Sequence, residues 1–470
     1  MTFVRKRGLT RFAATAAATG LLAAGAIATA APATADENPR NGGATATLEG
    51  LKIADLVDVE KDGKTHTYGA GLFVLNVEDG GTLHTYCIDF GTAAKNDSLY
   101  KETGWESTKL HGNPNAGKIH WILQNSYPAV DDLNALAEKV GAGSLTQKQA
   151  AAGTQAAIWG FSDGVDATPK NGNAKKLAEW LTKNAGTVEE PGASLELDPV
   201  QVSGKPGQKL GPVTVRTGSG SAVITPDPAA AESGVTVVDA EGQLVTESTP
   251  VADGAQLFFD VPEGAADGSA SLTASVTSQV PVGRALTGID VETQTMILAG
   301  SSDSSVSVNA TASWASEGPS PAVTAKETCV EGGVEVTVTN DGDEPFTFTL
   351  AGEERQVAPG GSESIVVPVE EGQAYEITVT GPEDGEDWVF TGVLECETGG
   401  DGGKEEVTEN DPTPDGGTEE EVEEDEGPNL AETGSSGSPM LIGGIALVLV
   451  LGGAGAVFML RKKAAATAGE

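Results

Sequence analysis

Aromatic and histidine side chains are concentrated in one part of the chain, and this limits where a large core can form. Residues 44–190 hold all four histidines, four of the six tryptophans and four of the five tyrosines. The 470 residues also include 62 glycines and 24 prolines, which favour turn-rich β structure with small cores. We therefore expect a shaped site within residues 44–190 and simpler β domains after it.

Two further folded units are predicted from alternating polar and apolar residues. Residues 193–318 alternate Val, Thr and Ser between turn residues, as at Val213–Val215, and predict an antiparallel β-sandwich. Residues 322–398 alternate in the same way, for example at Phe346–Leu350, and predict an immunoglobulin-like β-sandwich. The expected fold is therefore multidomain, with a mixed α+β domain followed by two β-sandwich (Ig-like) domains.

The first 35 residues have the pattern of a secretion signal. Basic residues at Arg5-Lys6-Arg7 precede an apolar stretch over 12–30, and the small residues Ala33-Thr34-Ala35 follow it. We expect the chain to be exported and the mature protein to begin at Asp36.

The opposite end has the pattern of a wall anchor. Residues 399–429 are acidic with one base, Lys404, and predict an extended disordered stalk. Residues 440–460 are apolar enough to span a bilayer, and the basic tail at 461–470 marks its cytoplasmic side. The pentapeptide between stalk and span resembles an LAxTG-type sortase sorting signal, which implies sortase processing and attachment to peptidoglycan. Without sortase cleavage the protein would be membrane-anchored in the same orientation. The pentapeptide residues are Leu430, Ala431, Glu432, Thr433 and Gly434.

Charge and residue spacing exclude several kinds of partner. The chain has 69 acidic and 28 basic residues, which argues against nucleic-acid binding because phosphates require basic patches. The four histidines lack the spacing of metal ligands. We expect no cofactor and no metal site.

The odd number of cysteines requires an explanation in an exported protein. Cys329 and Cys396 bracket the third unit, and we expect a disulfide between them that stabilises the fold by about 4 kcal/mol. Cys87 is left alone, and it has three possible fates: a buried structural cysteine, a nucleophile paired with a histidine, or a thiol bonded to another side chain. The nucleophile reading has little support, because His84 lies on the other face of the strand predicted at Leu83–Phe90 and no protease signature is present.

A helix predicted at Thr146–Phe161 carries a glutamine on an apolar face. Thr146 and Gln149 fit a capping box, and the alanine-rich sequence favours helix. Gln155 and Trp159 share a face through their four-residue spacing. By this pattern alone, Gln155 is most simply a surface residue beside a core tryptophan.

Three short motifs change this interpretation. They are Tyr86-Cys87-Ile88-Asp89, Leu123-Gln124-Asn125-Ser126-Tyr127 and Thr154-Gln155-Ala156-Ala157-Ile158-Trp159. With these motifs in this order, residues 44–190 resemble the thioester domains of Gram-positive surface adhesins, also called Cys-Gln thioester or TQxA domains. Thr293-Gln294 lacks a following Trp and a nearby Cys in sequence, so a Thr-Gln pair alone does not indicate such a domain.

The resemblance implies that Cys87 and Gln155 form an internal thioester, which acts once as an acyl donor to an amine on a host, cell or matrix surface. It implies an adhesin of the cell wall, not an enzyme. Apolar surroundings from Tyr86, Ile158 and Trp159 would shield the bond from water. Asp89, Gln124 and Thr154 are candidates for hydrogen bonds that position the reacting groups, and the alternative is that they are buried polar groups without a chemical role. The open alternatives are non-covalent binding, a Cys-dependent enzyme and a passive wall spacer.

Overall fold

The computed structural model describes residues 41–396 apart from 62, 79, 247–248 and 383–386. The predicted secretion signal, stalk, sorting pentapeptide and apolar span therefore lie outside the described residues. Within the described part, no helix is both long and apolar enough to cross a membrane.

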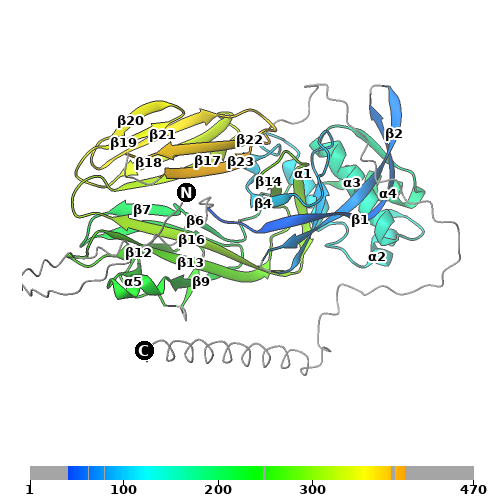
Figure 1. Ribbon diagram of the computed structural model, residues 1–470. Coiled ribbons are helices and arrows are strands. Elements are labelled where there is room, and N and C mark those ends of the chain that lie inside the picture. Colours follow the sequence, from blue (N-terminus) through cyan, green and yellow to red (C-terminus); the bar gives the residue numbers. More distant parts are fainter. Residues whose placement is uncertain (1–40, 62, 79, 247–248, 383–386, 397–470) are drawn as a thin grey trace, which may run out of the picture. The chain divides into compact units, whose positions relative to one another are not determined.

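A seven-stranded sheet organises the N-terminal part, and its strands come from two distant stretches of sequence. Five strands lie between residues 45 and 169, whereas the last two come from residues 285–301, inside the range predicted as the second unit. The boundaries 44–190 and 193–318 remain predictions, but the sheet itself joins both ranges (Figure 1). The strands are β1 (Thr45–Lys61), β2 (Lys64–Val77), β3 (Thr82–Cys87), β4 (Leu99–Thr103), β5 (Asp166–Pro169), β14 (Ala285–Gly288) and β15 (Met296–Ser301), in the order β2-β3-β15-β14-β4-β1-β5.

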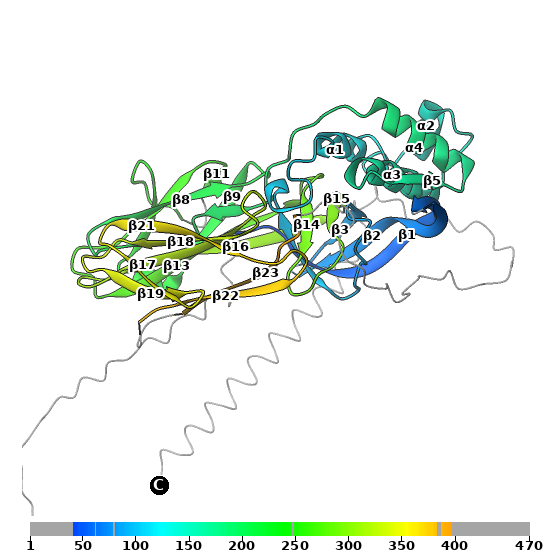
Figure 2. The same ribbon diagram turned by 90° about the horizontal axis from the view of Figure 1, so that it is seen from above.

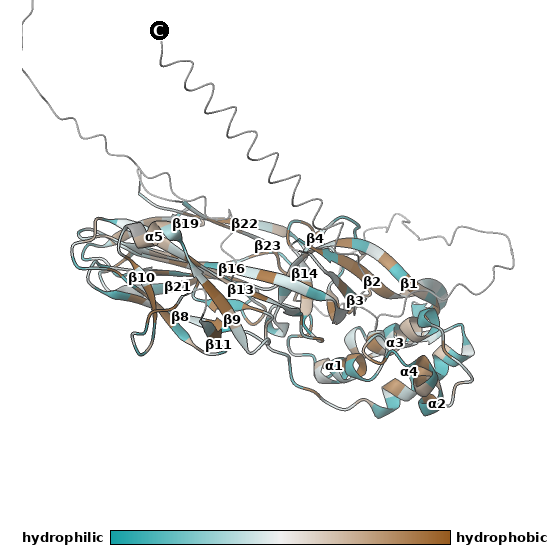
Figure 3. Cartoon of the chain, turned by 90° about the horizontal axis from the view of Figure 1, so that it is seen from below, coloured by the Kyte–Doolittle hydropathy of each residue, from teal (hydrophilic) through white to brown (hydrophobic). Residues whose placement is uncertain are grey.

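Four α-helices lie on one side of this sheet (Figure 2). The longest, α3, begins after the predicted N-cap Thr146, whose hydroxyl accepts a hydrogen bond from the Gln149 N–H while the Gln149 side chain accepts one from the Thr146 N–H. Hydrophobic and hydrophilic residues are both present around the helices (Figure 3). The helices are α1 (Ala116–Gln124), α2 (Leu133–Val140), α3 (Gln147–Ser162) and α4 (Gly172–Asn184), and a 3-10 turn, η1, spans Trp105–Ser107.

The strand β15 of this sheet is buried on both faces along Met296–Ala299. Along β15, Met296 and Leu298 join a core shared with the second unit, while Ile297 and Ala299 join the core beneath the helices. Successive side chains of a strand point to opposite faces, so a strand covered on both sides needs a continuous apolar run. This explains the uninterrupted apolar sequence from Met296 to Ala299.

Two sheets around one core form the second unit. They contain the four strands β10-β12-β8-β6 and the five strands β11-β9-β13-β16-β7. The sequence predicted antiparallel pairing, but β7 and β16 pair in parallel, which is possible because a long connection and not a hairpin joins them. The elements are β6 (Glu196–Asp198), β7 (Gln201–Gly204), β8 (Lys209–Arg216), β9 (Ser221–Pro226), α5 (Pro228–Glu232), β10 (Thr236–Asp239), β11 (Pro250–Ala252), β12 (Gln256–Asp260), β13 (Gly268–Gln279) and β16 (Asp303–Trp314).

The third unit has its own core between a three-stranded and a four-stranded sheet. Cys329 and Cys396 form a disulfide, with Sγ atoms 2.03 Å apart, as their spacing predicted. The immunoglobulin-like assignment of this unit stays a prediction. The strands are β17 (Pro321–Thr328), β18 (Gly333–Asn340), β19 (Phe346–Leu350), β20 (Glu353–Val357), β21 (Gly361–Pro368), β22 (Ala374–Thr380) and β23 (Asp387–Val393), ordered β17-β18-β21 and β20-β19-β22-β23.

Polar contacts join the third unit to the seven-stranded sheet. Lys101 of β4 forms an ion pair with Glu327 of β17, with Nζ and Oε1 2.7 Å apart. Beyond β23, the buried Glu395 accepts a hydrogen bond from the Thr295 hydroxyl. Thr295 immediately precedes β15, so the third unit contacts the strand that runs beside β3.

Candidate functional site

Cys87 and Gln155 meet where the last residue of β3 packs against the middle of α3. Cys87 pairs with Met296 of β15, which fixes the end of β3 inside the sheet. Small residues of α3 on either side of Gln155, including Ala151 and Ala152, are fully buried and allow helix and sheet to approach closely. Both Cys87 and Gln155 have an exposed fraction of 0%, so bulk water does not reach either side chain.

Two hydrogen bonds hold the Gln155 carboxamide against the backbone of Cys87. The Cys87 N–H donates to Gln155 Oε1 at 2.9 Å, and Gln155 Nε2 donates to the Cys87 carbonyl oxygen at 2.8 Å. A carboxamide held at both ends has a fixed plane and a fixed carbonyl direction. The arrangement presents the Gln155 carbonyl carbon to the residue that carries the thiol.

The Cys87 sulfur lies in surroundings that disfavour its charged form. The thiol is free, and burial raises its pKa well above the usual value, with further increases from the negative charges of Asp163 and Asp89. The Trp159 side chain and the Asp89 backbone N–H act in the opposite direction, and that N–H donates to Sγ at 3.2 Å. Cys87 is therefore a protonated thiol at neutral pH, and its thiolate is costly to form.

Two carboxylates flank the sulfur in different ways. Asp89 is 1% exposed and forms an ion pair with Lys109, which balances its buried charge. Asp163, just after α3, accepts hydrogen bonds from the Phe90 N–H at 2.9 Å and from the Ser162 hydroxyl at 2.6 Å. Burial raises the pKa of Asp163 from 3.8 to about 6, so its charge changes in mildly acidic solution.

Aromatic rings cover the site on the side of Trp159. Trp159 is 5% exposed and packs edge-to-face on Phe90, with ring centroids 5.0 Å apart, and Phe90 packs in the same way on Tyr68 at 5.1 Å. Tyr86, next to Cys87 in β3, is buried and donates its hydroxyl hydrogen bond to the Tyr127 carbonyl oxygen. The shielding role of Tyr86 and Trp159 stays a prediction.

The other two predicted supporting residues have different partners. Gln124, at the end of α1, lies at the surface, and its side chain is 2.9 Å from Nε2 of His120. Thr154 is buried, hydrogen-bonds to Ser126 and donates to the Ala150 carbonyl oxygen. The structure therefore links Thr154 to the packing of α3 and links Gln124 to His120, and within the described residues neither side chain hydrogen-bonds to Cys87 or Gln155.

The sequence around this pair has a recognisable family pattern. Residues 84–187 match the thioester domain family. No curated protein gives a match to the chain.

Solved structures, two of them described as thioester domains, are also similar to the chain. The Bacillus anthracis TIE protein shares 15% identity over 76% of this chain and 81% of its own, with a TM-score of 0.27. A thioester domain from Enterococcus faecium shares 15% identity over 58% of this chain and 96% of its own, with a TM-score of 0.27. The N-terminal thioester domain of a surface protein from Clostridium perfringens shares 18% identity over 27% of this chain and 79% of its own, with a TM-score of 0.23.

Thr293-Gln294, far from the thioester domain motifs in sequence, lies beside them in the structure. Gln294 Nε2 donates to the carbonyl oxygens of Asp89 and Thr92, at 3.1 and 3.0 Å, and the Ile88 N–H donates to the Thr295 carbonyl oxygen. Along the chain, no Cys lies near this pair and no Trp follows it, so the motifs do not point to its place beside the site. The available signal was the apolar run that follows it, which is typical of a strand buried on both faces.

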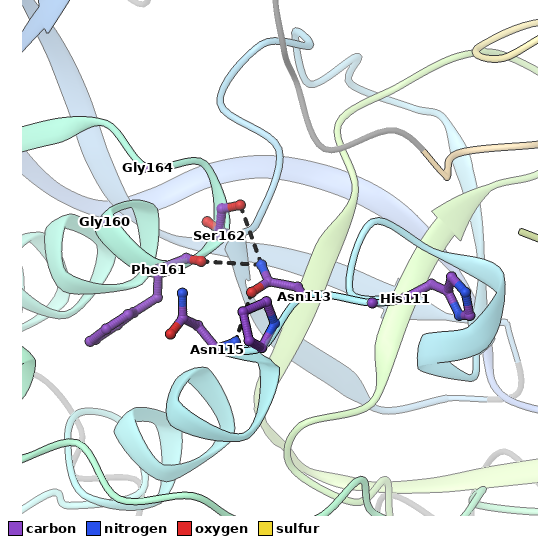
Figure 4. Close-up of a pocket in the computed structure, with 9 residues that line it drawn as sticks. His111, Asn113, Asn115, Gly160, Phe161, Ser162 and Gly164 are labelled. Carbon is purple, nitrogen blue, oxygen red and sulfur yellow. Dashed lines mark hydrogen bonds between the residues drawn. The ribbon is translucent and has the colours of Figure 1, made fainter.

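A pocket lies at the C-terminal end of α3, about two turns beyond Gln155 (Figure 4). Asn113 crosses it and donates to the carbonyl oxygens of Phe161 at 3.1 Å and Ser162 at 3.5 Å, which occupies two of the last carbonyls of the helix. Neither Cys87 nor Gln155 lines this pocket. Within the described ranges, no cluster of three or more His, Cys, Asp or Glu side chains is arranged to hold a metal ion.

Proposed function

We propose that Cys87 and Gln155 form an internal thioester, and that the protein uses it once to attach covalently to amines, chiefly lysine side chains, on a partner surface. The observation that carries the proposal is the pair of hydrogen bonds between the Gln155 carboxamide and the Cys87 backbone. The match of residues 84–187 to the thioester domain gives independent support.

Formation of the bond follows from these contacts. The Cys87 sulfur attacks the Gln155 carbonyl carbon, the C–N bond breaks, and the carboxamide nitrogen leaves as ammonia. The Cys87 N–H is already directed at Gln155 Oε1, where negative charge develops, so it acts as a preorganised oxyanion donor. Because the pair is held in contact, the reaction requires little further ordering.

The second reaction uses the stored acyl group. An amine attacks the same carbonyl carbon, an amide bond forms, and the electron pair of the C–S bond returns to sulfur. The attacking amine nitrogen loses one proton, and the Cys87 sulfur gains one as it becomes a thiol again. Since the product amide is stable, the protein is consumed in the reaction, and we propose a single-use adhesin and not an enzyme.

We further propose that the chain is exported and fixed to the cell wall. This part rests on sequence patterns alone: the leader before Asp36, the pentapeptide at 430–434 and the apolar span after it. Sortase would cut between Thr433 and Gly434 and join the chain to peptidoglycan. The membrane would then be a partner only before sorting.

Mass spectrometry of the purified full chain tests the thioester. We expect the mass to be lower than that of the sequence by one ammonia, and methylamine to add to the protein and release one thiol. Cys87→Ala and Gln155→Ala should abolish both changes, whereas Gln147→Ala, at an exposed position of the same helix, should preserve them. A full sequence mass in freshly prepared protein would refute the proposal and leave non-covalent binding, and repeated turnover of a substrate would indicate an enzyme.

A further inference from the structure

The indole N–H of Trp159 is a buried hydrogen-bond donor without an acceptor. Its residue is 5% exposed, and Nε1 has no hydrogen-bond partner among the described residues. Leaving a buried donor unsatisfied costs about 1–3 kcal/mol. The buried Tyr86 hydroxyl, in contrast, donates to the Tyr127 carbonyl oxygen. A donor held in this way is available to a group that becomes an acceptor during the reaction.

The position of Trp159 indicates which group that is. Trp159 follows Gln155 by one helical turn, on the same face of α3, and Gln155 is hydrogen-bonded to Cys87. The Trp159 ring also packs on Phe90, three residues after Cys87. The indole is therefore held next to Gln155, which is hydrogen-bonded to Cys87, and against Phe90, which follows Cys87 in the chain. Consistent with this, a weak hydrogen-bonding interaction of the Trp159 side chain, short of a full hydrogen bond, lowers the pKa of the Cys87 thiol against the larger opposing effect of burial.

We propose that Trp159 Nε1–H stabilises the Cys87 thiolate as it leaves, together with the Asp89 backbone N–H that already donates to Sγ at 3.2 Å. The inference rests on the proposed thioester chemistry. When the amine attacks Gln155, the C–S electron pair moves to sulfur, and the two N–H groups receive it. The proton released by the amine nitrogen then neutralises the sulfur.

The charged groups around the sulfur explain why such donors are needed. Asp163 and Asp89 both disfavour a negative sulfur, and Lys109 compensates Asp89 through their ion pair. Burial acts in the same direction as the two carboxylates. Without donors the thiolate would be a very poor leaving group, and attack by an amine would stop at the addition step. Trp159 is thus a catalytic residue for opening the bond, beyond its role as a shield.

The test replaces the donor and keeps the ring. Benzothienylalanine, which carries sulfur in place of the indole N–H, is introduced at Trp159 in the full chain, and at the half-buried Trp180 of α4 as a matched control. The rate of thiol release by methylamine should fall about ten- to hundredfold for the Trp159 replacement, as expected for a lost hydrogen bond to a charged group. The Trp180 replacement should react like the wild type.

A second measurement separates donation from packing. After methylamine opening, the ultraviolet absorbance of the Cys87 thiolate is followed against pH, with Cys87→Ala as the blank. Loss of the donor should move this titration to higher pH by about one unit or more. A change in packing at Trp159 without loss of a donor should leave the titration where it is.

Each outcome decides the inference. A slower reaction with an unshifted titration would assign Trp159 a packing role and overturn it, as would an unchanged rate. If the Trp159 replacement forms no thioester and so shows no ammonia deficit, the titration of its free Cys87 thiol still tests the donor role. If the wild type itself shows no ammonia deficit, the thioester is refuted, and this outcome is distinct from a failure of the donor role alone.

Discussion

At the scale of single residues, the environment of Cys87 sets the lifetime of the proposed bond. A thioester is attacked more slowly when its thiol has a high pKa, because the sulfur then leaves with more difficulty. Burial, Asp163 and Asp89 all raise the pKa of the Cys87 thiol. On the proposed route, in which the protein is exported before it meets a partner, this resistance to water would preserve the reactive group.

Asp163 should make the opening reaction depend on pH. Its pKa is raised by burial to about 6, so it is charged above that pH and neutral below it. A neutral Asp163 no longer disfavours the thiolate, so the rate with methoxyamine, an amine that remains largely unprotonated, should rise several-fold as pH falls through 6. Asp163→Asn should remove this dependence and be fast throughout.

Thiol release against pH provides the measurement, with Asp166→Asn at an exposed position as the control. Asparagine keeps an oxygen that can accept from the Phe90 N–H, so the fold of the segment should be preserved. An identical pH profile in the wild type and in Asp163→Asn would contradict this role.

At the scale of secondary-structure elements, close packing of α3 against α4 fixes where Gln155 lies. Gly153 of α3 has no side chain, and a Cβ there would approach the Ala174 carbonyl oxygen to 2.6 Å and the Leu177 Cβ to 3.2 Å. Such contacts are too short to accept without movement of one helix. The glycine thus permits an approach that positions the neighbouring Thr154 and Gln155 against β3.

Gly153→Ala should therefore lower the free energy of unfolding by about 1–3 kcal/mol, the usual cost of overpacking a core. It should also reduce the fraction of protein with an ammonia deficit, because α3 must shift. Gly160→Ala is the matched control in the same helix, since its Cβ would meet only the Val165 carbonyl oxygen at 4.0 Å. That change should stabilise by about 0.5–1 kcal/mol. Denaturant unfolding and intact mass measure both effects, and equal behaviour of the two variants would contradict the packing argument.

Local elements of the site were predictable from sequence, whereas their long-range neighbours were not. The capped helix carrying Gln155 and a strand through Cys87 follow from the Thr146 capping box and from alternation, which are properties of adjacent residues. The strand was predicted at Leu83–Phe90, whereas β3 ends at Cys87. The pairing of Cys87 with Met296 depends on which distant strand lies beside β3, and residue periodicity does not contain that information. For the same reason, motif order alone did not reveal that Gln124 contacts His120.

At the scale of the whole molecule, the third unit contacts the strand beside the reactive pair. Glu395 lies next to the disulfide-bonded Cys396 and is 3% exposed, with its carboxyl group hydrogen-bonded to Thr295. Burial raises the pKa of Glu395 from 4.5 to about 8, so the folded protein keeps this carboxyl protonated at neutral pH. The contact is thus sensitive to the loss of that proton.

Glu395→Gln should change how stability depends on pH. Between pH 4.5 and about 8 the folded state holds a proton that the unfolded state has lost, so wild-type stability decreases as pH rises through this window. Glutamine is neutral at all these pH values and should remove that part of the decrease. Thermal unfolding across the window measures the difference, with the exposed Glu376→Gln of β22 as the control. Parallel curves for Glu395→Gln and the wild type would contradict the prediction.

The position of β15 has a consequence for the order of synthesis. A chain crossing a membrane N-terminus first delivers Cys87 and Gln155 long before Met296, yet Met296 is the residue paired with Cys87. The sheet around the thiol is complete only after residues 285–301 have emerged and inserted between β3 and β4. The proposed electrophile would then be assembled late, once most of the molecule is outside, and a chain stalled during transit would carry an unreactive amide and thiol instead of a group able to couple to the secretion machinery.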